Sequence, residues 1–273
     1  MQARDPHRYV NELDAAAVER LIARLEGRAK DAVFTRRCDN YAGRLDVPAG
    51  GRVLEVGCGT GAMTRALARR ADFRGVALGV DHSAAFVAAA NEFAAREGIA
   101  DRATFRVGDA QRLDFPDGGF DAVFAHTVLS HVAEPSAMLG EMARVTRRGG
   151  TVAIFDGDYQ SMTYGHPDHE FGRRMDTALV NASFNNPRIM RELARRLPAH
   201  GLRLKSAWGD AVVEIGQASY FRSFAETYAP YIVRSGACPQ SEVDAWLASQ
   251  HEAMRDGTFF ASCTYYTYLA TRA

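Results

Sequence analysis

The sequence predicts an α/β protein whose central sheet is mostly parallel and carries helices on both faces. From residue 52 to residue 156, short runs rich in β-branched and apolar residues alternate with segments of helical periodicity. A glycine-rich turn joins the first of these runs to the helix that follows it. The chain has 273 residues, 47% of them hydrophobic, which is enough for one large domain with its own core.

The first fifty residues predict a helical cap ahead of the sheet. Between positions 18 and 25, four apolar residues are spaced i, i+3, i+4, i+7, as on the buried face of an amphipathic helix. A second helix is expected over residues 31–41. Pro48 and the two glycines after it then break the chain before the first strand.

From residue 52 the pattern predicts five strands separated by helices. The strands are expected at residues 52–56, 75–80, 103–107, 120–125 and 150–155. The helices between them are expected at residues 62–70, 84–97 and 137–146. Strands separated by helices form βαβ units, whose parallel strands are joined by right-handed crossovers with few exceptions.

After residue 156 the regularity fades, and four helices and a strand pair are expected. The helices are expected at residues 168–182, 187–197, 218–233 and 241–255. The strand pair, near residues 202–208 and 259–269, completes the sheet. Because the second of these strands is apolar on both faces, it is expected in the interior of the sheet. The division of residues 204–215 stays open.

The strongest local signal is the turn after the first strand, Val53-Leu54-Glu55-Val56-Gly57-Cys58-Gly59-Thr60-Gly61. Gly57, Gly59 and Gly61 permit positive φ angles and let the backbone come close to a ligand. The helix that follows offers unpaired N–H groups and a partial positive charge. Since the turn also fits the dinucleotide motif G-x-G-x-x-G/A, with Ala62 in the last place, an NAD-dependent oxidoreductase stays an alternative.

Three acidic residues lie near the ends of the first three strands. Asp81 ends the second strand, where a carboxylate would hold the ribose hydroxyls of NAD or of S-adenosylmethionine. Glu55, two residues before the first glycine, suits a ligand with a cationic ammonium and sulfonium and suits a pyrophosphate poorly. Asp109, with Ala110 after the third strand, can accept a hydrogen bond from an adenine amino group. Together they favour S-adenosylmethionine.

Residues 52–156 resemble the core of class I S-adenosylmethionine-dependent methyltransferases, close to the ubiquinone/menaquinone-biosynthesis type. The resemblance is carried by the glycine turn, by Phe120-Asp121-Ala122-Val123 with Val128-Leu129-Ser130-His131-Val132, and by Glu141-Met142-Ala143-Arg144-Val145 with Gly149-Gly150. Arg148 stands where the family often has proline.

The resemblance implies a Rossmann-like sheet of seven strands, the last antiparallel, in a single methyltransferase domain over residues 1–273. Residues 1–50 would form the helical cap, 51–156 the cofactor-binding core, and 157–273 the substrate-side helices and closing strands. It implies methyl transfer to a small-molecule acceptor by in-line displacement, with S-adenosylmethionine across the carboxyl ends of the first strands. The expected cofactor-binding residues are Glu55, Gly57, Cys58, Gly59, Gly61, Asp81, His82, Asp109, Ala110 and His126.

A catalytic base is needed only where the acceptor carries a proton at neutral pH. The candidates are His131, Asp158 and His126, of which His126 ends the fourth strand. Asp156 and Asp158 are expected in a polar loop that opens to the substrate side, although a loop capped by its own aspartates is the alternative.

Aromatic residues supply the remaining candidates for a substrate pocket. Five of them repeat at helical spacing, which fits either a core face or the wall of an apolar pocket: Tyr220, Phe221, Phe224, Tyr228 and Tyr231. Tyr9 and Tyr41 of the cap are candidates to close over the cofactor.

Composition argues against several other classes of protein. Lys+Arg and Asp+Glu number 33 each, so the net charge of zero gives no global support for binding nucleic acid or an anionic membrane. No Asn/Asp-Pro-Pro-Tyr/Phe motif of nucleic acid methylation follows the fourth strand, and a nucleic acid or protein methyltransferase is therefore the weaker alternative. A non-catalytic cofactor-binding protein stays open.

The same composition bears on metals and location. The four cysteines form no C-x-x-C pair, and His166 with His169 lacks zinc spacing, so no metal is expected. No run approaches the ~18 apolar residues of a membrane span. Residues 1–10 lack the apolar stretch of a signal peptide. A cytoplasmic protein without a membrane partner is expected, and a homo-oligomer stays open.

Overall fold

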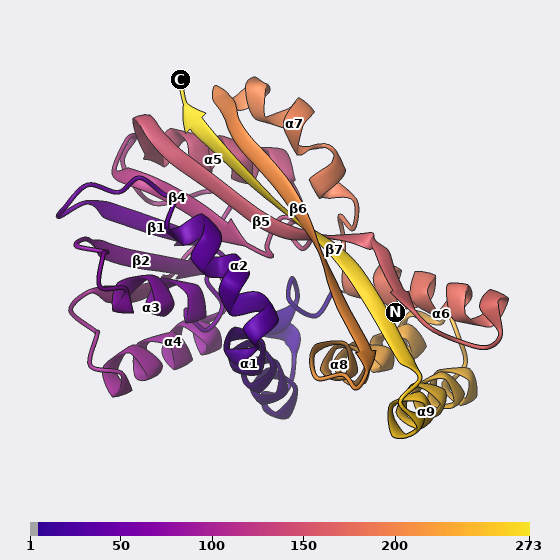
Figure 1. The fold of residues 1–273 in the computed structure, drawn as a ribbon. Coiled ribbons are helices and arrows are strands. Elements are labelled where there is room, and N and C mark those ends of the chain that lie inside the picture. The colour runs from indigo at the N-terminus through magenta and orange to yellow at the C-terminus, as the bar shows by residue number, and fades with distance from the viewer. Residues whose placement is uncertain (1–4) are drawn as a thin grey trace.

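The computed structural model describes residues 5–273, apart from the side chains of residues 32, 33 and 38. Its strands are β1 (Arg52–Val56), β2 (Val76–Asp81), β3 (Ala103–Val107), β4 (Phe120–His126), β5 (Thr146–Tyr164), β6 (Leu202–Gly216) and β7 (Phe259–Arg272). They form one seven-stranded sheet in the order β3-β2-β1-β4-β5-β7-β6 (Figure 1). Only β7 runs antiparallel to its neighbours, and this confirms the predicted fold class.

Helices cover both faces of the sheet. They are α1 (Ala15–Lys30), α2 (Ala32–Ala42), α3 (Ala62–Arg69), α4 (Ala84–Arg96), α5 (Pro135–Val145), α6 (His169–Ser183), α7 (Leu193–Arg196), α8 (Tyr220–Ser235) and α9 (Gln240–Asp256). Three short 3₁₀ turns add to them, η1 (Val10–Glu12), η2 (Ile189–Arg191) and η3 (Leu197–His200). No helix in the described part of the chain is long and apolar enough to cross a membrane.

The central parallel strands are buried on both faces, as their apolar sequences require. Leu54 of β1 lies in register between Leu78 of β2 and Val123 of β4. On one face, α5 packs against β4 and β5 through side chains with no exposed area, among them Met138 and Met142. These contacts hold the carboxyl ends of β1, β2 and β4 in fixed positions.

The strand after α5 is much longer than the predicted residues 150–155. β5 continues to Tyr164 because β7 pairs with it beyond residue 155, with Asp156 opposite Tyr266 and Asp158 opposite Thr264. The prediction of a polar loop at these two aspartates is therefore wrong. Residues 204–215, left open above, belong to one strand, β6, which pairs with the whole length of β7.

The helix predicted over residues 187–197 is also wrong, because this segment is divided into η2, α7 and the start of η3. The Tyr268 hydroxyl donates to the Met190 carbonyl oxygen, an acceptor that a continuous helix would use itself. Beyond the core, β5, β6 and β7 extend as a long twisted ribbon, whose far end carries α6, α8 and α9 (Figure 1).

The helix α1 connects the two parts of the molecule. Asp14 caps it by accepting a hydrogen bond from the Ala17 amide. Along its length α1 contacts α3 and α4 on the side of the parallel strands, and α8 on the side of the long ribbon. The cap thus lies over the carboxyl ends of the first strands, where open α/β sheets bind their ligands.

Candidate active site

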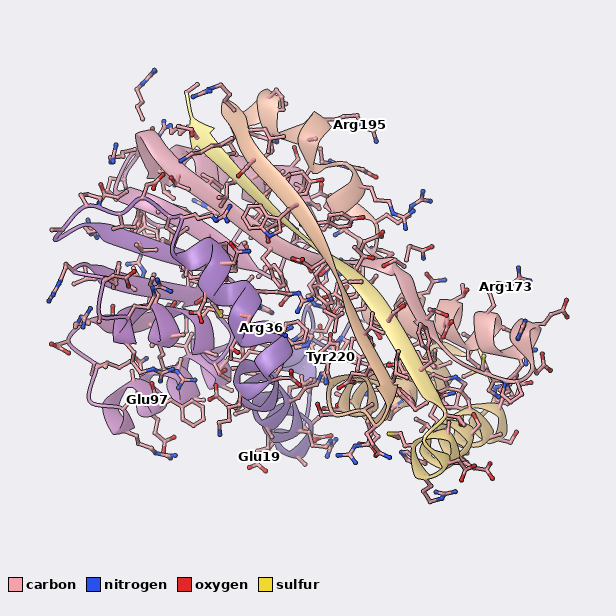
Figure 2. The ribbon with its side chains drawn as sticks, in the orientation of Figure 1. Glu19, Arg36, Glu97, Arg173, Arg195 and Tyr220 are labelled. Carbon is pink, nitrogen blue, oxygen red and sulfur yellow. The ribbon has the colours of Figure 1, made fainter. Side chains whose placement is uncertain are left out.

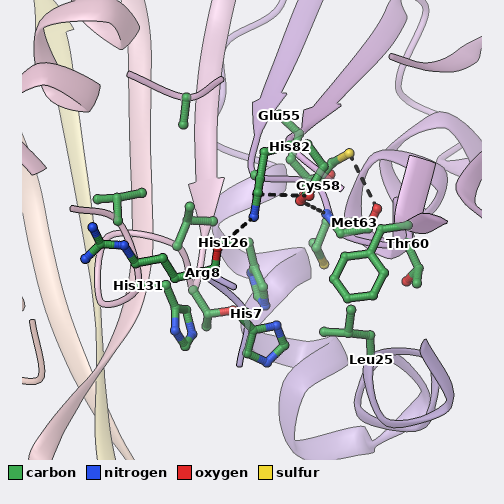
Figure 3. A pocket seen from close by; sticks show the side chains of 18 of the residues that line it. His7, Arg8, Leu25, Glu55, Cys58, Thr60, Met63, His82, His126 and His131 are labelled. Atoms are coloured by element: carbon green, nitrogen blue, oxygen red, sulfur yellow. Dashed lines mark hydrogen bonds and ion pairs between the residues drawn. The ribbon is translucent and has the colours of Figure 1, made fainter. Parts of the chain in front are cut away.

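A cavity of about 440 Å³ lies at the carboxyl ends of β1, β2 and β4, beneath α1 and α8. Side chains from all three parts of the chain line it. Figure 3 shows those of the segment before η1, His7 and Arg8, beside residues of the core. Of the predicted cofactor-binding residues, all except Gly61 contribute to its wall: Glu55, Gly57, Cys58, Gly59, Asp81, His82, Asp109, Ala110 and His126. His131 lines it too. Most of the residues predicted for the site therefore line one cavity.

The glycine turn has a backbone that other residues would strain. Gly57 has φ 72°, and a Cβ atom there would lie 2.5 Å from a methyl group of Val128. Gly61 has φ 73° and precedes α3, and its Cβ would lie 2.3 Å from the Phe105 ring. Gly61 thus shapes the turn from behind without lining the cavity, whereas Gly57 presents bare backbone to it.

Asp81 ties the glycine turn to the next strand. One of its carboxylate oxygens accepts a hydrogen bond from the Gly59 amide at 2.8 Å, and the other accepts one from the Ser83 amide at 2.9 Å. The cap of α4 is Ser83, whose hydroxyl accepts from the Phe86 amide. Because Asp81 is not needed as the cap, its remaining acceptor capacity is directed at the cavity that it lines.

The position of Asp109 allows both of the roles considered from the sequence. Its carboxylate accepts a hydrogen bond from the Gln111 amide at 2.8 Å, which closes the turn after β3. Asp109 and Ala110 also line the cavity. A turn role and a ligand role are therefore compatible at this residue.

Glu55 is buried beneath the glycine turn, with 2% of its surface exposed. Burial raises the pKa of this carboxyl to about 8, although hydrogen bonds from the Thr64 amide and hydroxyl partly oppose the rise. The amide bond, at 2.9 Å, joins the end of β1 to the first turn of α3. Glu55 therefore supports the turn directly and lines the cavity with a proton that a nearby cation would displace.

His126 lies at the end of β4 among aromatic rings. Its Nδ1 is 2.9 Å from the Tyr41 hydroxyl, and its ring stacks on Phe155 with centroids 4.6 Å apart. Burial lowers the pKa of the imidazole well below its usual value, and the positive charge of Arg28 adds to this. Tyr41 is buried behind His126 and does not line the cavity, nor does Tyr9, so the prediction that these tyrosines close over the cofactor is wrong.

His131 forms a close pair with a residue that the sequence did not single out. Its Nδ1 is 2.7 Å from Oδ2 of Asp5, which is 4% exposed. Burial lowers the pKa of this imidazole, but the Asp5 carboxylate outweighs burial and the net pKa is raised. The ring of His7 lies 4.8 Å from that of His131, and His7 Nε2 is 2.6 Å from the Tyr228 hydroxyl (Figure 3).

The two aspartates of β5 do not reach the cavity. Asp158 pairs with Arg191 at 2.8 Å, which corrects its assignment as a candidate base facing the substrate. Asp156 is fully buried and accepts hydrogen bonds from the Ser130 amide and hydroxyl, at 3.0 and 3.1 Å. It therefore supports the loop that carries His131 and does not contact a ligand itself.

The aromatic stripe of α8 divides between core and cavity. Tyr220, Phe224 and Tyr228 line the cavity, whereas Phe221 and Tyr231 do not. Facing them from α1 are two arginines that the sequence analysis missed, Arg24 and Arg28. Among the residues that the structure describes, no group of three or more His, Cys, Asp or Glu side chains could hold a metal ion.

Comparison with known proteins identifies the central part of the chain. Residues 54–154 match a family model described as a methyltransferase domain. The chain is 34% identical to 27-O-demethylrifamycin SV methyltransferase from Amycolatopsis mediterranei over 131 residues, which are 48% of this chain and 47% of that protein. The chain spans less than two thirds of the length of these curated relatives, from 31% to 64%.

Solved structures share the fold at low sequence identity. The geranyl diphosphate C-methyltransferase from Streptomyces coelicolor A3(2), in complex with Mg²⁺, geranyl diphosphate and S-adenosyl-L-homocysteine, has a TM-score of 0.56 at 19% identity, over 88% of this chain and 79% of that chain. The [4+2]-cyclase SpnF has a TM-score of 0.57 at 23% identity, over 87% of this chain and 80% of that one. The motifs, the sheet order and the family match together assign residues 54–154 to a methyltransferase domain, and these residues resemble the class I S-adenosylmethionine-dependent type.

Proposed function

We propose that this protein transfers the methyl group of S-adenosylmethionine to a small-molecule acceptor bound in the same cavity. The observation that carries the proposal is that the glycine turn, Asp81 and Asp109 line one cavity together with residues of α1 and α8. The names of curated relatives, which include rifamycin and sterol methyltransferases, support a small-molecule acceptor. The ubiquinone/menaquinone subclass, cytoplasmic location and a homo-oligomer stay predictions.

The residues present fit the cofactor. Only glycine fits at position 57, where a Cβ atom would lie 2.5 Å from a methyl group of Val128, and carboxylates stand at the ends of successive strands. Asp81 would hold the ribose hydroxyls and Asp109 the adenine amino group, while Glu55 would face the ammonium of the amino acid end. When bound, S-adenosylmethionine supplies a methyl group on an activated leaving group. The chain is then required mainly to align the acceptor and exclude water.

His131 is the candidate base where the acceptor is a hydroxyl. With Nδ1 facing Asp5, the Nε2 atom is the nitrogen left to accept a proton. Asp5 orients the ring and stabilises the imidazolium that forms, which is the arrangement expected of a general base. His126 would contact the cofactor, and its bond to Tyr41 and its stacking on Phe155 hold it in place.

A single domain is the organisation that this site supports. The cavity combines His7 and Arg24 of the cap, Asp81 of the core and Tyr220 of the C-terminal part. None of these three parts alone encloses it.

Calorimetric titration with S-adenosylhomocysteine and a labelled-donor assay over a panel of small acceptors test the proposal. Asp81→Ala and Gly59→Val are expected to lower affinity for the product by at least about 100-fold. The first removes a carboxylate that lines the cavity, and the second places a β-branched side chain at a φ of 51°. The exposed Asp101→Ala is the matched control and should bind like the wild type. A melting temperature unaffected by S-adenosylhomocysteine would overturn the proposal.

A further inference from the structure

The wall of the cavity carries three carboxylates and three arginines. Carboxylates line the end that we assign to the cofactor, namely Glu55, Asp81 and Asp109. The arginines on the wall are Arg8, which precedes η1, and Arg24 and Arg28 of α1, and all three are partly buried. In the described part of the chain, Asp5 pairs with His131 and with neither Arg24 nor Arg28. The part of the wall next to α8 therefore carries a positive side chain, Arg24.

Arg24 has neutral partners only. Its guanidinium carbon lies 5.0 to 5.5 Å from the ring centroids of Tyr220, Phe224 and Tyr228, and its Nη1 donates to the Ser223 hydroxyl at 2.9 Å. Within residues 5–273, no carboxylate lies within ion-pair distance of it. Tyr220 lies toward the centre of the molecule, facing α1, whereas Glu19 projects from the outer side of the same helix (Figure 2).

Arg28, one helical turn further along α1, has a similar environment. Its Nη2 donates to the Thr127 hydroxyl at 3.0 Å, and its guanidinium lies over the Phe34 ring at 5.6 Å. It too has no ion pair in the described part of the chain. By contrast, Arg65, which is more deeply buried, pairs with both Glu26 and Glu97.

Two cations of one helix thus face one cavity without a counter-ion, which is an unfavourable arrangement for partly buried charges. A ligand oxyanion placed between them would relieve their repulsion and fill the free donors of the planar guanidinium forks. A cationic ligand would instead meet two like charges. Nor could it use the ring faces of Tyr220, Phe224 and Tyr228, because Arg24 already occupies them.

We propose that the methyl acceptor carries an oxyanion, a carboxylate or a phosphate, and that Arg24 binds it. This inference rests on the proposed function, because it concerns the acceptor half of the same cavity. Arg24 is held by side chains of α8, whereas Arg28 is bonded to Thr127 just after β4, closer to the cofactor end. The carboxylate of the cofactor itself is the other source of an anion, and the test separates the two.

The first arm of the test compares two cofactor fragments by calorimetry. S-adenosylhomocysteine carries a carboxylate, and 5′-methylthioadenosine lacks the whole amino acid. Arg24→Met should leave the affinity for both within about threefold of the wild type, as should the exposed control Arg20→Met on the same helix. If Arg24→Met weakens only S-adenosylhomocysteine, Arg24 faces the cofactor and the inference is overturned.

The second arm titrates the protein with benzoate and phenyl phosphate, and with benzyl alcohol and benzylammonium as neutral and cationic counterparts. Each titration is run with and without S-adenosylhomocysteine. A failure of the proposed function would appear as an absence of S-adenosylhomocysteine binding, separately from the result with the anionic probes. An anionic probe should bind at least about 30-fold more tightly than its counterparts, and Arg24→Met should remove this preference. No preference for anions in the wild type, or an unchanged preference in Arg24→Met, overturns the inference.

A third variant separates ligand binding from helix packing. Ser223→Ala removes the hydrogen bond that ties Arg24 to α8 and keeps the guanidinium. It should retain the anion preference within about threefold even if its melting temperature falls. Loss of the preference in both Ser223→Ala and Arg24→Met, with equal loss of melting temperature, would show that Arg24 only joins α1 to α8.

Discussion

Glu55→Gln is predicted to stabilise the free protein, by a margin that grows with pH. Burial raises the pKa of Glu55 from 4.5 to about 8, while the hydrogen bonds from Thr64 oppose the rise. Between these pH values the unfolded chain ionises at this residue and the folded chain stays protonated. The stability that Glu55 contributes is therefore fully present below pH 4.5 and is lost as the pH rises toward about 8.

The size of this effect follows from the same shift. At ~1.4 kcal/mol for each pH unit, the loss between pH 4.5 and 8 has an upper limit of about 5 kcal/mol. Glutamine cannot ionise and keeps an acceptor oxygen for the Thr64 amide. Relative to wild type, the variant should gain at least about 2 kcal/mol of unfolding free energy between pH 5 and pH 8.5, after allowance for relaxation around the ionised group.

Urea unfolding of both proteins without cofactor measures this difference. The other titrating groups are the same in the two proteins, so their contributions to the free energy cancel in the difference. A difference that stays within ~0.5 kcal/mol across the range would refute the reasoning. Binding gives a second readout, since an ammonium beside Glu55 favours the ionised form. S-adenosylhomocysteine should bind the wild type more tightly as pH rises from 6.5 to 8 and release a proton, whereas the affinity of Glu55→Gln should stay flat.

Three further predictions concern the residues around the cavity. Asp5→Asn removes the charge that raises the pKa of His131. The acidic limb of the pH profile of kcat/KM should therefore move to lower pH. An unmoved limb would contradict the proposed pair. Gly57→Ala should weaken S-adenosylhomocysteine binding at least about tenfold in calorimetry, because φ is 72° there and Cβ would clash; unchanged affinity contradicts this. Arg191→Met leaves Asp158 buried without its partner and should lower the free energy of unfolding in urea by about 1–3 kcal/mol. The affinity for S-adenosylhomocysteine should stay unchanged, and a loss of affinity would show that Asp158 belongs to the site.

The parts of the fold that the sequence predicts well are those specified by neighbouring residues. The strands at residues 52–56 and 103–107 have the predicted bounds, because glycines and runs of apolar residues mark their ends locally. The predicted strands at the positions of β5 and β6 are too short, because the full length of both strands depends on residues far away in the sequence. Their second halves exist because β7, about a hundred residues after β5, pairs with both, and no short-range pattern reports that pairing.

The residues of the site also divide into those that a local motif locates and those that only the folded chain brings together. The glycine turn and its acids lie within or directly after strands, so a local motif locates them. Asp5 and His7 were missed because 126 residues separate Asp5 from His131, and only the folded cap brings them together. A polar segment before the first helix gives no sign that it will line a cavity.

Arg24 and Arg28 did have a signal in the sequence. With Leu21 and Leu25 they occupy positions i, i+3, i+4 and i+7 of one helix, so they share the face whose leucines are buried or line the cavity. Arginine on the apolar face of a helix normally pairs with a carboxylate, because an unpaired buried charge is costly. Where the folded chain supplies no such carboxylate, a ligand is the remaining source of negative charge, and selection of the acceptor would then reside in α1. The fold alone does not determine the acceptor or the reaction, because a protein of similar fold is a [4+2]-cyclase.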